Sequence, residues 1–234
     1  MNDILGEALS GFYLQKSKAK LWIHTAYGDK EEMPLEVYFR DHRQMSLLEK
    51  TALKNCKGSV LDVGAGAGSH SLVLQSLPQH YLKVTALDVS AKACGVMRQR
   101  GVVEVVKANF FNYKPLKKFD TLLLLMNGIG LCGSLDRVSI FLDHASSLLQ
   151  EGGQIIFDSS DVSYLYNDAF PFPDKKYYGE IKYSYGYKKQ LSNSFSWLYV
   201  DRHTLKKTAK AAGWTFKLIT EDENGQYLAR LKRV

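Results

Sequence analysis

The chain has 234 residues, of which 45% are hydrophobic and 24% are charged, a composition that suits one globular domain rather than a disordered chain. No apolar run approaches the roughly 20 residues of a membrane-spanning helix, and the first residues lack a signal-peptide pattern, so we expect a cytoplasmic protein without membrane contact. Three separated cysteines and scattered histidines match no zinc site or disulfide framework, so we expect no metal.

The net charge of +7 is compatible with binding to nucleic acid, and equally with ordinary solubility. The basic residues are spread along the chain rather than gathered in one segment, which favours solubility. Nucleic acid stays as the alternative partner.

The first 45 residues form a segment of their own that precedes the α/β pattern. Aromatic side chains are frequent in this segment, at Phe12, Tyr13, Trp22, Tyr27, Tyr38 and Phe39. Because open α/β sheets bind ligands at the carboxyl ends of their strands, we predict a helical cap (1–45) over that edge and a main domain at 46–234.

From residue 46 onward, helical and strand patterns alternate, which indicates parallel strands joined by crossover helices. Ser46 and Ser90 are expected to cap two helices, Gly101 to end one, and Pro78 to stop another. The strands are predicted at 60–63, 83–88, 102–107, 119–126 and 154–158, and the helices at 47–53, 69–77, 91–100 and 136–149.

The last third of the chain has a different pattern. Residues 177–200 alternate aromatic and polar side chains, which predicts an inserted β-hairpin, and strands at 217–221 and 227–231 follow a helix at 204–212, joined through Asn224-Gly225. The predicted fold class is α/β: a doubly wound, mostly parallel seven-stranded sheet with an antiparallel C-terminal hairpin, an N-terminal helical cap and an inserted β-hairpin.

A glycine-rich stretch, Asp62-Val63-Gly64-Ala65-Gly66-Ala67-Gly68, follows the first strand of the main domain. No lysine follows it, as a phosphate loop would require, and Ser69 stands where a dinucleotide loop has its third glycine. The carboxylate of Asp62 would repel a pyrophosphate but attract an ammonium and a sulfonium group, and S-adenosylmethionine carries both of these cations and no phosphate. A tight turn without a ligand is the alternative.

A second carboxylate supports a nucleoside ligand. Asp88 lies twenty residues after Gly68, at the end of the second predicted strand, where it can accept both ribose hydroxyls. Taken alone it would be a helix cap or a surface acid, but beside the glycine-rich stretch the ribose role is favoured.

In these features the chain resembles the class I S-adenosylmethionine-dependent methyltransferases, a Rossmann-like family. Residues 60–74 resemble the first motif of the family, and residues 87–90, 108–110, 119–130 and 151–157 resemble the motifs that follow, in the same order. The resemblance runs from about residue 47 to the C-terminus. It implies a methyltransferase that uses S-adenosylmethionine as its cofactor.

The resemblance implies a role for each matching position. Asp62 would face the methionine amino group, the glycines Gly64, Gly66 and Gly68 would pass beneath the ligand, and Asp88 would hold the ribose. Further implied ligand contacts are Val89, Asn109, Phe110 and Met126. Asn109 replaces the usual aspartate but can still accept through its amide oxygen, whereas Val89 and Phe110 could equally be core residues.

The methyl acceptor should lie over the ends of the fourth and fifth strands. Asp158 is the preferred candidate to orient or deprotonate it, and His203 is the runner-up base, although a turn cap explains Asp158 equally well. Asn127 is the third candidate, but Gly128-Ile129-Gly130 replaces the prolines and aromatic residue typical of enzymes that methylate amide or exocyclic amine nitrogens. That chemistry is therefore less favoured.

Two further features allow two interpretations each. Arg40 could reach the ligand carboxylate from the cap or form a surface ion pair. The aromatic residues of the inserted hairpin could form the wall of an acceptor pocket or a dimer interface, so both a monomer and a homodimer are compatible with the sequence. These residues are Tyr178, Tyr183, Tyr185, Tyr187 and Trp197.

The leading functional hypothesis is methyl transfer from S-adenosylmethionine to a small-molecule acceptor. The alternatives are a methyltransferase that acts on RNA or protein, a non-catalytic S-adenosylmethionine-binding protein, and a nicotinamide-dependent oxidoreductase.

Overall fold

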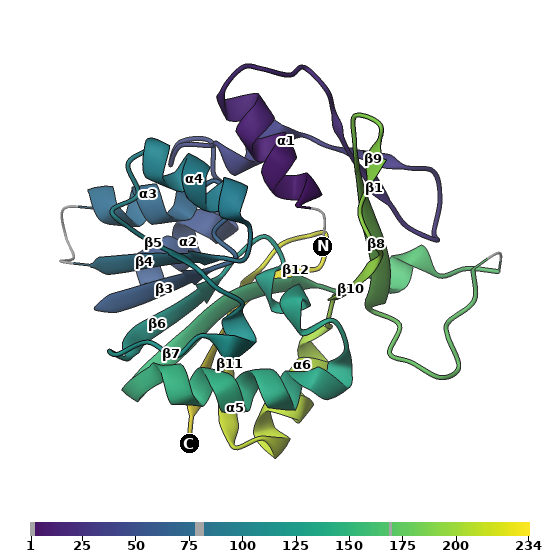
Figure 1. Cartoon of the computed structure of the whole chain (residues 1–234). Helices are drawn as coiled ribbons and strands as arrows, with labels where there is room; N and C mark the ends of the chain where they lie inside the picture. Colours follow the sequence, from purple (N-terminus) through teal and green to yellow (C-terminus); the bar gives the residue numbers. More distant parts are fainter. Residues whose placement is uncertain (1–2, 78–81, 169) are drawn as a thin grey trace.

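A computed structural model describes residues 3–77, 82–168 and 170–234 (Figure 1). Its centre is a seven-stranded sheet of order β11-β12-β7-β6-β3-β4-β5. Strands β3 to β7 pair in parallel, and β12 runs antiparallel to both β7 and β11. The bounds are β3 (Ser59–Val63), β4 (Lys83–Asp88), β5 (Glu104–Lys107), β6 (Phe119–Leu124), β7 (Leu149–Ser160), β11 (Trp214–Glu221) and β12 (Gln226–Arg233). The predicted sheet and its C-terminal hairpin are confirmed.

Helices cover both faces of this sheet, as Figure 1 shows. The helices are α2 (Leu47–Asn55), α3 (Ser69–Ser76), α4 (Ala91–Gln99), α5 (Val138–Leu148) and α6 (Arg202–Ala211). Strand β6 carries three consecutive leucines because both of its faces are buried: Leu122 and Leu124 pack with α5 and α6, whereas Leu123 packs with α2 and α3 on the opposite face. In a strand segment that is buried on both faces, apolar residues follow one another instead of alternating with polar ones.

The helix boundaries follow from local chemistry. Ser46 accepts a hydrogen bond from the backbone N–H of Glu49 (3.2 Å), and the Glu49 carboxylate accepts one from the Ser46 N–H (2.9 Å), which forms a capping box. The Ser90 hydroxyl caps α4, and Gly101 follows that helix with φ +95°. The expected stop at Pro78 lies outside the described residues.

A second, smaller sheet joins two distant parts of the chain. Its order is β10-β8-β1-β2, with β9 paired to β8. Strands β1 (Leu21–His24) and β2 (Glu31–Met33) follow helix α1 (Ile4–Tyr13), and β8 (Glu180–Tyr187), β9 (Gln190–Leu191) and β10 (Phe195–Leu198) belong to the insertion. The inserted hairpin is confirmed by the antiparallel pairing of β8 with β10.

The expectation of a purely helical cap was incomplete. Residues 21–33 contribute two strands, and β1 pairs with β8 in a register that places Leu21 opposite Tyr187. Local patterns could not show this pairing, because its partners lie more than 150 residues apart. The cap and the insertion therefore form one structural unit, to which we refer as the second sheet together with α1.

This unit is anchored next to the central sheet through α4. The Asp3 carboxylate accepts hydrogen bonds from the Gly6 N–H (3.0 Å) and from the Ser90 hydroxyl (2.7 Å), so it caps α1 and ties it to the start of α4. An exposed ion pair joins Glu7 to Lys92. Within the described ranges, no helix is long and apolar enough to span a bilayer.

Candidate active site

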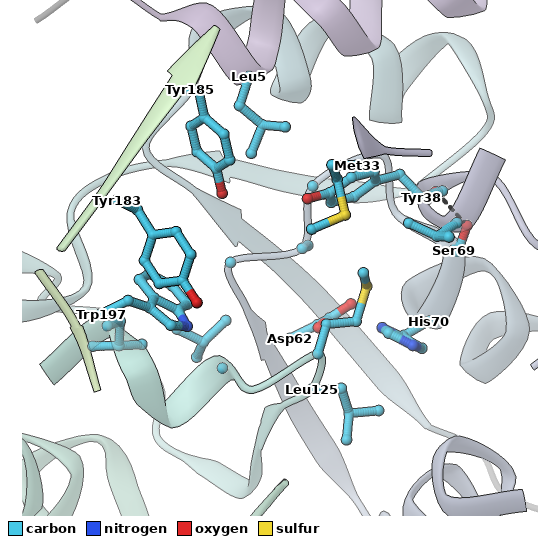
Figure 2. A pocket seen from close by; sticks show the side chains of 18 of the residues that line it. Leu5, Met33, Tyr38, Asp62, Ser69, His70, Leu125, Tyr183, Tyr185 and Trp197 are labelled. Atoms are coloured by element: carbon cyan, nitrogen blue, oxygen red, sulfur yellow. Dashed lines mark hydrogen bonds between the residues drawn. The ribbon is translucent and has the colours of Figure 1, made fainter. Parts of the chain in front are cut away.

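A cavity opens between the second sheet and the carboxyl ends of β3 and β6 (Figure 2). It contains about 1030 Å³ of space free of atoms, part of it open to solvent. The order of the strands reverses at β3, whose neighbours are β4 and β6. Open α/β sheets bind ligands at such a switch point.

The glycine-rich stretch forms one wall of the cavity. Gly64, Gly66 and Gly68 have φ values of +71°, +56° and +83°, in the region that glycine adopts without strain. A Cβ on Gly64 would meet no atom within 4 Å, whereas one on Gly68 would lie 2.7 Å from the Val102 side chain. Gly64 therefore leaves room for a ligand, and Gly68 is required by packing. Gly68 is outside the cavity lining, at the start of α3.

Asp62 lies at the base of the cavity. Its side chain is 2% exposed, and its carboxylate accepts a hydrogen bond from the Ser71 hydroxyl (2.6 Å). Burial raises the pKa of Asp62, while the charge of His70 and the hydrogen bond from Ser71 act in the opposite direction. A buried carboxylate of this kind favours a cationic ligand group at the cavity floor.

Asp88 lies at the end of β4 and holds the glycine-rich stretch in place. Its two carboxylate oxygens accept hydrogen bonds from the backbone N–H groups of Gly66 (2.9 Å) and Ser90 (2.8 Å). Burial raises the pKa of Asp88, against the effect of these two hydrogen bonds. The carboxylate thus occupies the strand tip that the sequence indicates, with a structural role in shaping the loop.

The three residues expected near the adenine lie in different environments. Val89 follows β4 and is 67% exposed. The Asn109 side chain is exposed and accepts a hydrogen bond from the Phe111 N–H (2.9 Å), so it caps a short 3-10 helix (Phe110–Asn112). Phe110 is a core residue, with its ring 5.3 Å from that of Phe141. Of the two interpretations for Phe110, the structure supports the core.

Arg40 does not line the cavity. Its guanidinium donates to the Glu49 carboxylate (2.7 Å) and to the Val37 carbonyl (3.0 Å). Of the two interpretations of Arg40, the structure therefore supports the ion pair and not the contact with the ligand carboxylate. Glu49 also contacts His70, whose Nε2 lies 2.9 Å from the same carboxylate oxygen. The buried Glu49 therefore links the cap to His70, which does line the cavity.

The pKa of Glu49 reflects this environment. Burial alone would raise the pKa, but the hydrogen bonds from His70 and from the Ser46 N–H, together with the charges of His70 and Arg40, lower it to about 2. The carboxylate is thus ionised and fixes the orientation of the His70 ring. His70 was not among the residues predicted from the sequence, because its partner Glu49 is 21 residues away on another helix.

The turn after β6 contributes Met126 to the cavity wall, but its polar neighbour Asn127 is outside the lining. Met126 and Asn127 both have a left-handed backbone, with φ of +60° and +57°. The Asn127 amide group donates to the Leu198 carbonyl (3.1 Å). Among the described residues, the cavity lining therefore includes Met126 and not Asn127.

Asp158 lies beside the same turn, on the neighbouring strand, and is outside the cavity lining. Its carboxylate accepts hydrogen bonds from the Asn127 N–H (2.9 Å) and from the Gln226 side chain (2.8 Å). Burial raises the pKa of Asp158 to about 6, against both hydrogen bonds. The structure thus supports the interpretation of Asp158 as a turn cap. It does not support direct contact between Asp158 and an acceptor.

His203 is also remote from the cavity. It is exposed near the start of α6, which packs with α5 on one face of the central sheet, and its N–H is capped by Asp201. None of the three residues expected to act on the acceptor lines the cavity in the described part of the chain.

The second sheet forms the opposite wall of the cavity from aromatic side chains. Tyr183, Tyr185 and Trp197 were among the hairpin residues considered for this role, and Figure 2 shows them on the side away from Asp62 and His70. Tyr178 and Tyr187 lie outside the lining: Tyr178 donates to Asp161, and Tyr187 is buried against α1. Phe195 and Tyr199, which were not predicted to do so, complete this wall. Tyr38 also lines the cavity, but it lies beside the glycine-rich stretch, 3.2 Å from where a Cβ on Gly66 would be.

Comparisons with known proteins agree with this geometry. A family model described as a methyltransferase domain matches residues 60–153, and no curated protein sequence matches the chain. The crystal structure of an S-adenosylmethionine-dependent methyltransferase from Bacteroides fragilis, in complex with S-adenosyl-L-homocysteine, is 38% identical in sequence, with a TM-score of 0.90. The match covers 99% of this chain and 95% of that one.

Two further structures share the fold at low identity. CalS10, an amino pentose methyltransferase from Micromonospora echinaspora, is 16% identical with a TM-score of 0.58, over 88% of this chain and 99% of that one. The sugar N-methyltransferase KedS8 from Streptoalloteichus sp ATCC 53650 is 14% identical with a TM-score of 0.57, over 90% and 97%.

The similarity to the Bacteroides protein extends over nearly the full length of both chains, and it confirms the family, the fold and the cofactor predicted from the sequence. The chain belongs to the S-adenosylmethionine-dependent methyltransferases, and its methyl donor is S-adenosylmethionine.

Proposed function

We propose that this enzyme methylates a small molecule, which binds on the aromatic side of the cavity. The observation that carries the proposal is the continuity of the cavity: one space is lined by the glycine-rich stretch on one side and by the second sheet on the other. Residues 3–45 and 177–200 together cover the sheet edge, so they act as a lid that leaves room for a compact acceptor.

The residues present fit the cofactor. Bound S-adenosylmethionine supplies a methyl group on a positively charged sulfur, which makes the methyl carbon electrophilic. Asp62 would hold the amino group, Gly64 and Gly66 would lie beneath the ligand, and Asp88 would turn one carboxylate oxygen toward the ribose hydroxyls. Val89 and Asn109 would then border the adenine at the strand edge, and Met126 would contact the ligand from the β6 turn.

His70 takes the role first considered for Arg40, that of the partner for the methionine carboxylate. Among the described residues it is the basic side chain in the cavity lining, and its Nε2 lies 2.9 Å from the Glu49 carboxylate. Arg40 supports this arrangement from behind Glu49.

The remaining residues position the reactants and exclude water. Methyl transfer is an in-line displacement, so its rate depends on holding the attacking atom close to the methyl carbon and in line with it. The hydrogen bond between Asp158 and Asn127 fixes the turn that carries Met126 and Gly128 into the cavity. Asp158 and Asn127 are thus positioning residues, and His203 has no part in this proposal.

Neighbouring structures support a small acceptor. CalS10 and KedS8 are by their descriptions an amino pentose and a sugar N-methyltransferase, and both have this fold. The net charge of +7 is compatible with a second candidate, methylation of RNA or protein.

The test uses S-adenosylmethionine with an isotope-labelled methyl group. The protein is incubated with a cell extract that has been separated into low-molecular-weight, RNA and protein fractions. We expect the label in the low-molecular-weight fraction. Label in the RNA or protein fraction alone, or in no fraction, would refute the proposal.

A further inference from the structure

The charge of the cavity lining differs from that of the whole chain. The chain carries a net charge of +7, yet no lysine or arginine is among the described residues that line the cavity. The ionisable groups there are Asp62, His70 and four tyrosines. An acceptor with a phosphate or a carboxylate would find no counter-charge on the aromatic side of the cavity.

The aromatic side consists of rings at different angles to each other. Phe195 is central: its ring centroid lies 5.2 Å from that of Tyr185, 6.1 Å from that of Tyr183 and 6.3 Å from that of Trp197. The angle between the planes is 27° to Tyr183 and 84° to Trp197, so the rings form a corner rather than a stack. Such corners surround cations, because each ring face carries partial negative charge.

Two contacts hold this corner in place. The Tyr183 hydroxyl donates to the Tyr199 hydroxyl (2.9 Å), and the Trp197 indole N–H donates to the Asn127 carbonyl (3.1 Å). A Cβ on Gly130 would collide with the Trp197 ring, so this glycine lets the ring pack against the β6 turn. The ring positions are therefore built into the fold.

No base is available on the aromatic side. Burial raises the pKa of Tyr38, Tyr183, Tyr185 and Tyr199, so these hydroxyls stay protonated at neutral pH. Asp62 and His70 lie on the cofactor side, where Ser71 and Glu49 engage them (Figure 2). An alcohol acceptor would need a group to remove its proton, and this wall has none to offer.

We propose that the acceptor is an aliphatic amine, whose nitrogen lies in the aromatic corner formed by Tyr183, Tyr185, Phe195 and Trp197. This inference rests on the proposed small-molecule function and names the chemical class of its substrate. The amine attacks in its neutral form, after its ammonium proton has passed to solvent, because only this form carries a free lone pair, and no base on the protein is needed. Amide and exocyclic amine nitrogens differ in this respect, because their lone pair is delocalised.

The bonds and charges of the step balance. The nitrogen lone pair forms the new N–C bond, the S–C bond breaks with its electron pair on sulfur, and the methylated ammonium then loses a proton to solvent. Positive charge therefore moves from sulfur to nitrogen during the transfer. Rings placed around the nitrogen stabilise this charge more in the transition state than in the ground state, which accelerates the reaction.

The first test measures binding by calorimetry to the protein saturated with S-adenosylhomocysteine. The probes are choline, its neutral isostere 3,3-dimethylbutan-1-ol, and 3,3-dimethylbutanoate. Choline should bind about tenfold more tightly than the neutral probe, and the anion should bind least, as expected for a desolvated cation among aromatic rings. Equal binding of choline and the neutral probe, tighter binding of the anion, or no binding of any probe would overturn the proposal.

Variants show whether the rings are responsible. Phe195→Leu should remove most of the preference for choline without changing the affinity for S-adenosylhomocysteine, and Phe195→Tyr should keep the preference because it keeps a ring. Tyr164→Leu is the matched control, since Tyr164 is 74% exposed and outside the cavity lining. An unchanged preference in Phe195→Leu would refute the assignment.

The second test separates this inference from the proposed function. The low-molecular-weight fraction is treated with N-hydroxysuccinimidyl acetate, which acylates amines in water, before the labelled methyl donor and the enzyme are added. We expect the treatment to abolish the labelled product. A labelled product that survives acylation would overturn the amine acceptor and leave the small-molecule function intact, whereas label only in RNA or protein would refute the small-molecule function itself.

Discussion

The carboxylate of Asp158, on strand β7, accepts a hydrogen bond of 2.9 Å from the backbone N–H of Asn127, in the turn that follows the neighbouring strand β6. This contact fixes a turn in which Met126 and Asn127 both have a left-handed backbone. Such conformations cost about 1–3 kcal/mol each for residues other than glycine and persist only where the surroundings hold them. A buried acid is thus used for the shape of the site rather than for its chemistry.

The stability of the protein should depend on pH through Asp158. Its pKa rises on folding from the ordinary value of 3.8 to about 6, so the native state binds the proton more tightly than the unfolded state. This contribution is complete below about pH 4 and is lost as the pH rises through 6, with a size of up to about 3 kcal/mol. As the pH falls from 7 to 4, the free energy of unfolding of the wild type should therefore rise relative to that of Asp158→Asn, which cannot titrate. Urea titrations at several pH values measure this, and a constant difference would contradict it.

Glu49 should show the opposite pH dependence. Its pKa falls on folding from the ordinary value of 4.5 to about 2, so its contribution to stability is complete above 4.5 and is lost as the pH drops toward 2. Glu49→Gln should cost about 3 kcal/mol at pH 7, because it leaves His70 and Arg40 without their anion. The difference from the wild type should shrink below pH 4.5 in urea titrations, while Glu36→Gln, on the exposed surface, changes little.

The amino-acid end of the cofactor should depend on Asp62 and His70. S-Adenosylhomocysteine has this end, whereas 5′-methylthioadenosine lacks it and keeps the adenosine. Asp62→Asn and His70→Gln should each reduce the preference for S-adenosylhomocysteine by roughly tenfold, the typical effect of losing a hydrogen bond to a charged group. Asp88→Ala should weaken both ligands alike.

Calorimetry gives the affinities for this comparison, and Asp143→Asn, on the exposed side of α5, is the control. The stability of the protein without ligand separates a binding role of Asp62 from a merely structural one. If Asp62 binds the ligand, Asp62→Asn should be as stable as the wild type or more stable, because burial raises the pKa of Asp62 and its charge is costly in the free protein. If Asp62 had only a structural role, Asp62→Asn should be less stable. If Asp62→Asn and His70→Gln weaken both ligands equally, these residues do not bind the amino-acid end.

Two glycines of the same stretch should respond differently to alanine. Gly68→Ala places a Cβ 2.7 Å from the Val102 side chain at a φ of +83°, and it should lower the free energy of unfolding by about 2 kcal/mol or more. Gly64→Ala has a φ of +71° but no neighbour within 4 Å, so it should cost only about 1–2 kcal/mol.

The new methyl group of Gly64→Ala would project into the cavity, so this variant should lose affinity for S-adenosylhomocysteine more strongly than stability. Urea titration and calorimetry on both variants separate the two effects. Equal losses of stability with unchanged affinity would show that the space above Gly64 is not used by the ligand.

The sequence by itself determined the central sheet and the cofactor end of the site. Apolar runs such as that of β6, serine caps and the Asn224-Gly225 turn are local signals, and their order along the chain is enough to indicate the doubly wound fold. The glycine-rich stretch and the acids Asp62 and Asp88 also lie within a few residues of strand ends. Local signals of this kind can be recognised in the sequence without knowing which elements pack against them.

The tertiary structure decided which polar groups remain free for chemistry. Arg40 is engaged by Glu49, Asp158 by Asn127 and Gln226, and Phe110 by the core, whereas His70 and Tyr199 reach the cavity. The pairing of β1 with β8, which joins residues more than 150 positions apart, attaches the aromatic hairpin to the N-terminal segment. Contacts over such distances depend on how the elements pack, because burial and hydrogen-bond partners are properties of the folded chain and have no local pattern in the sequence.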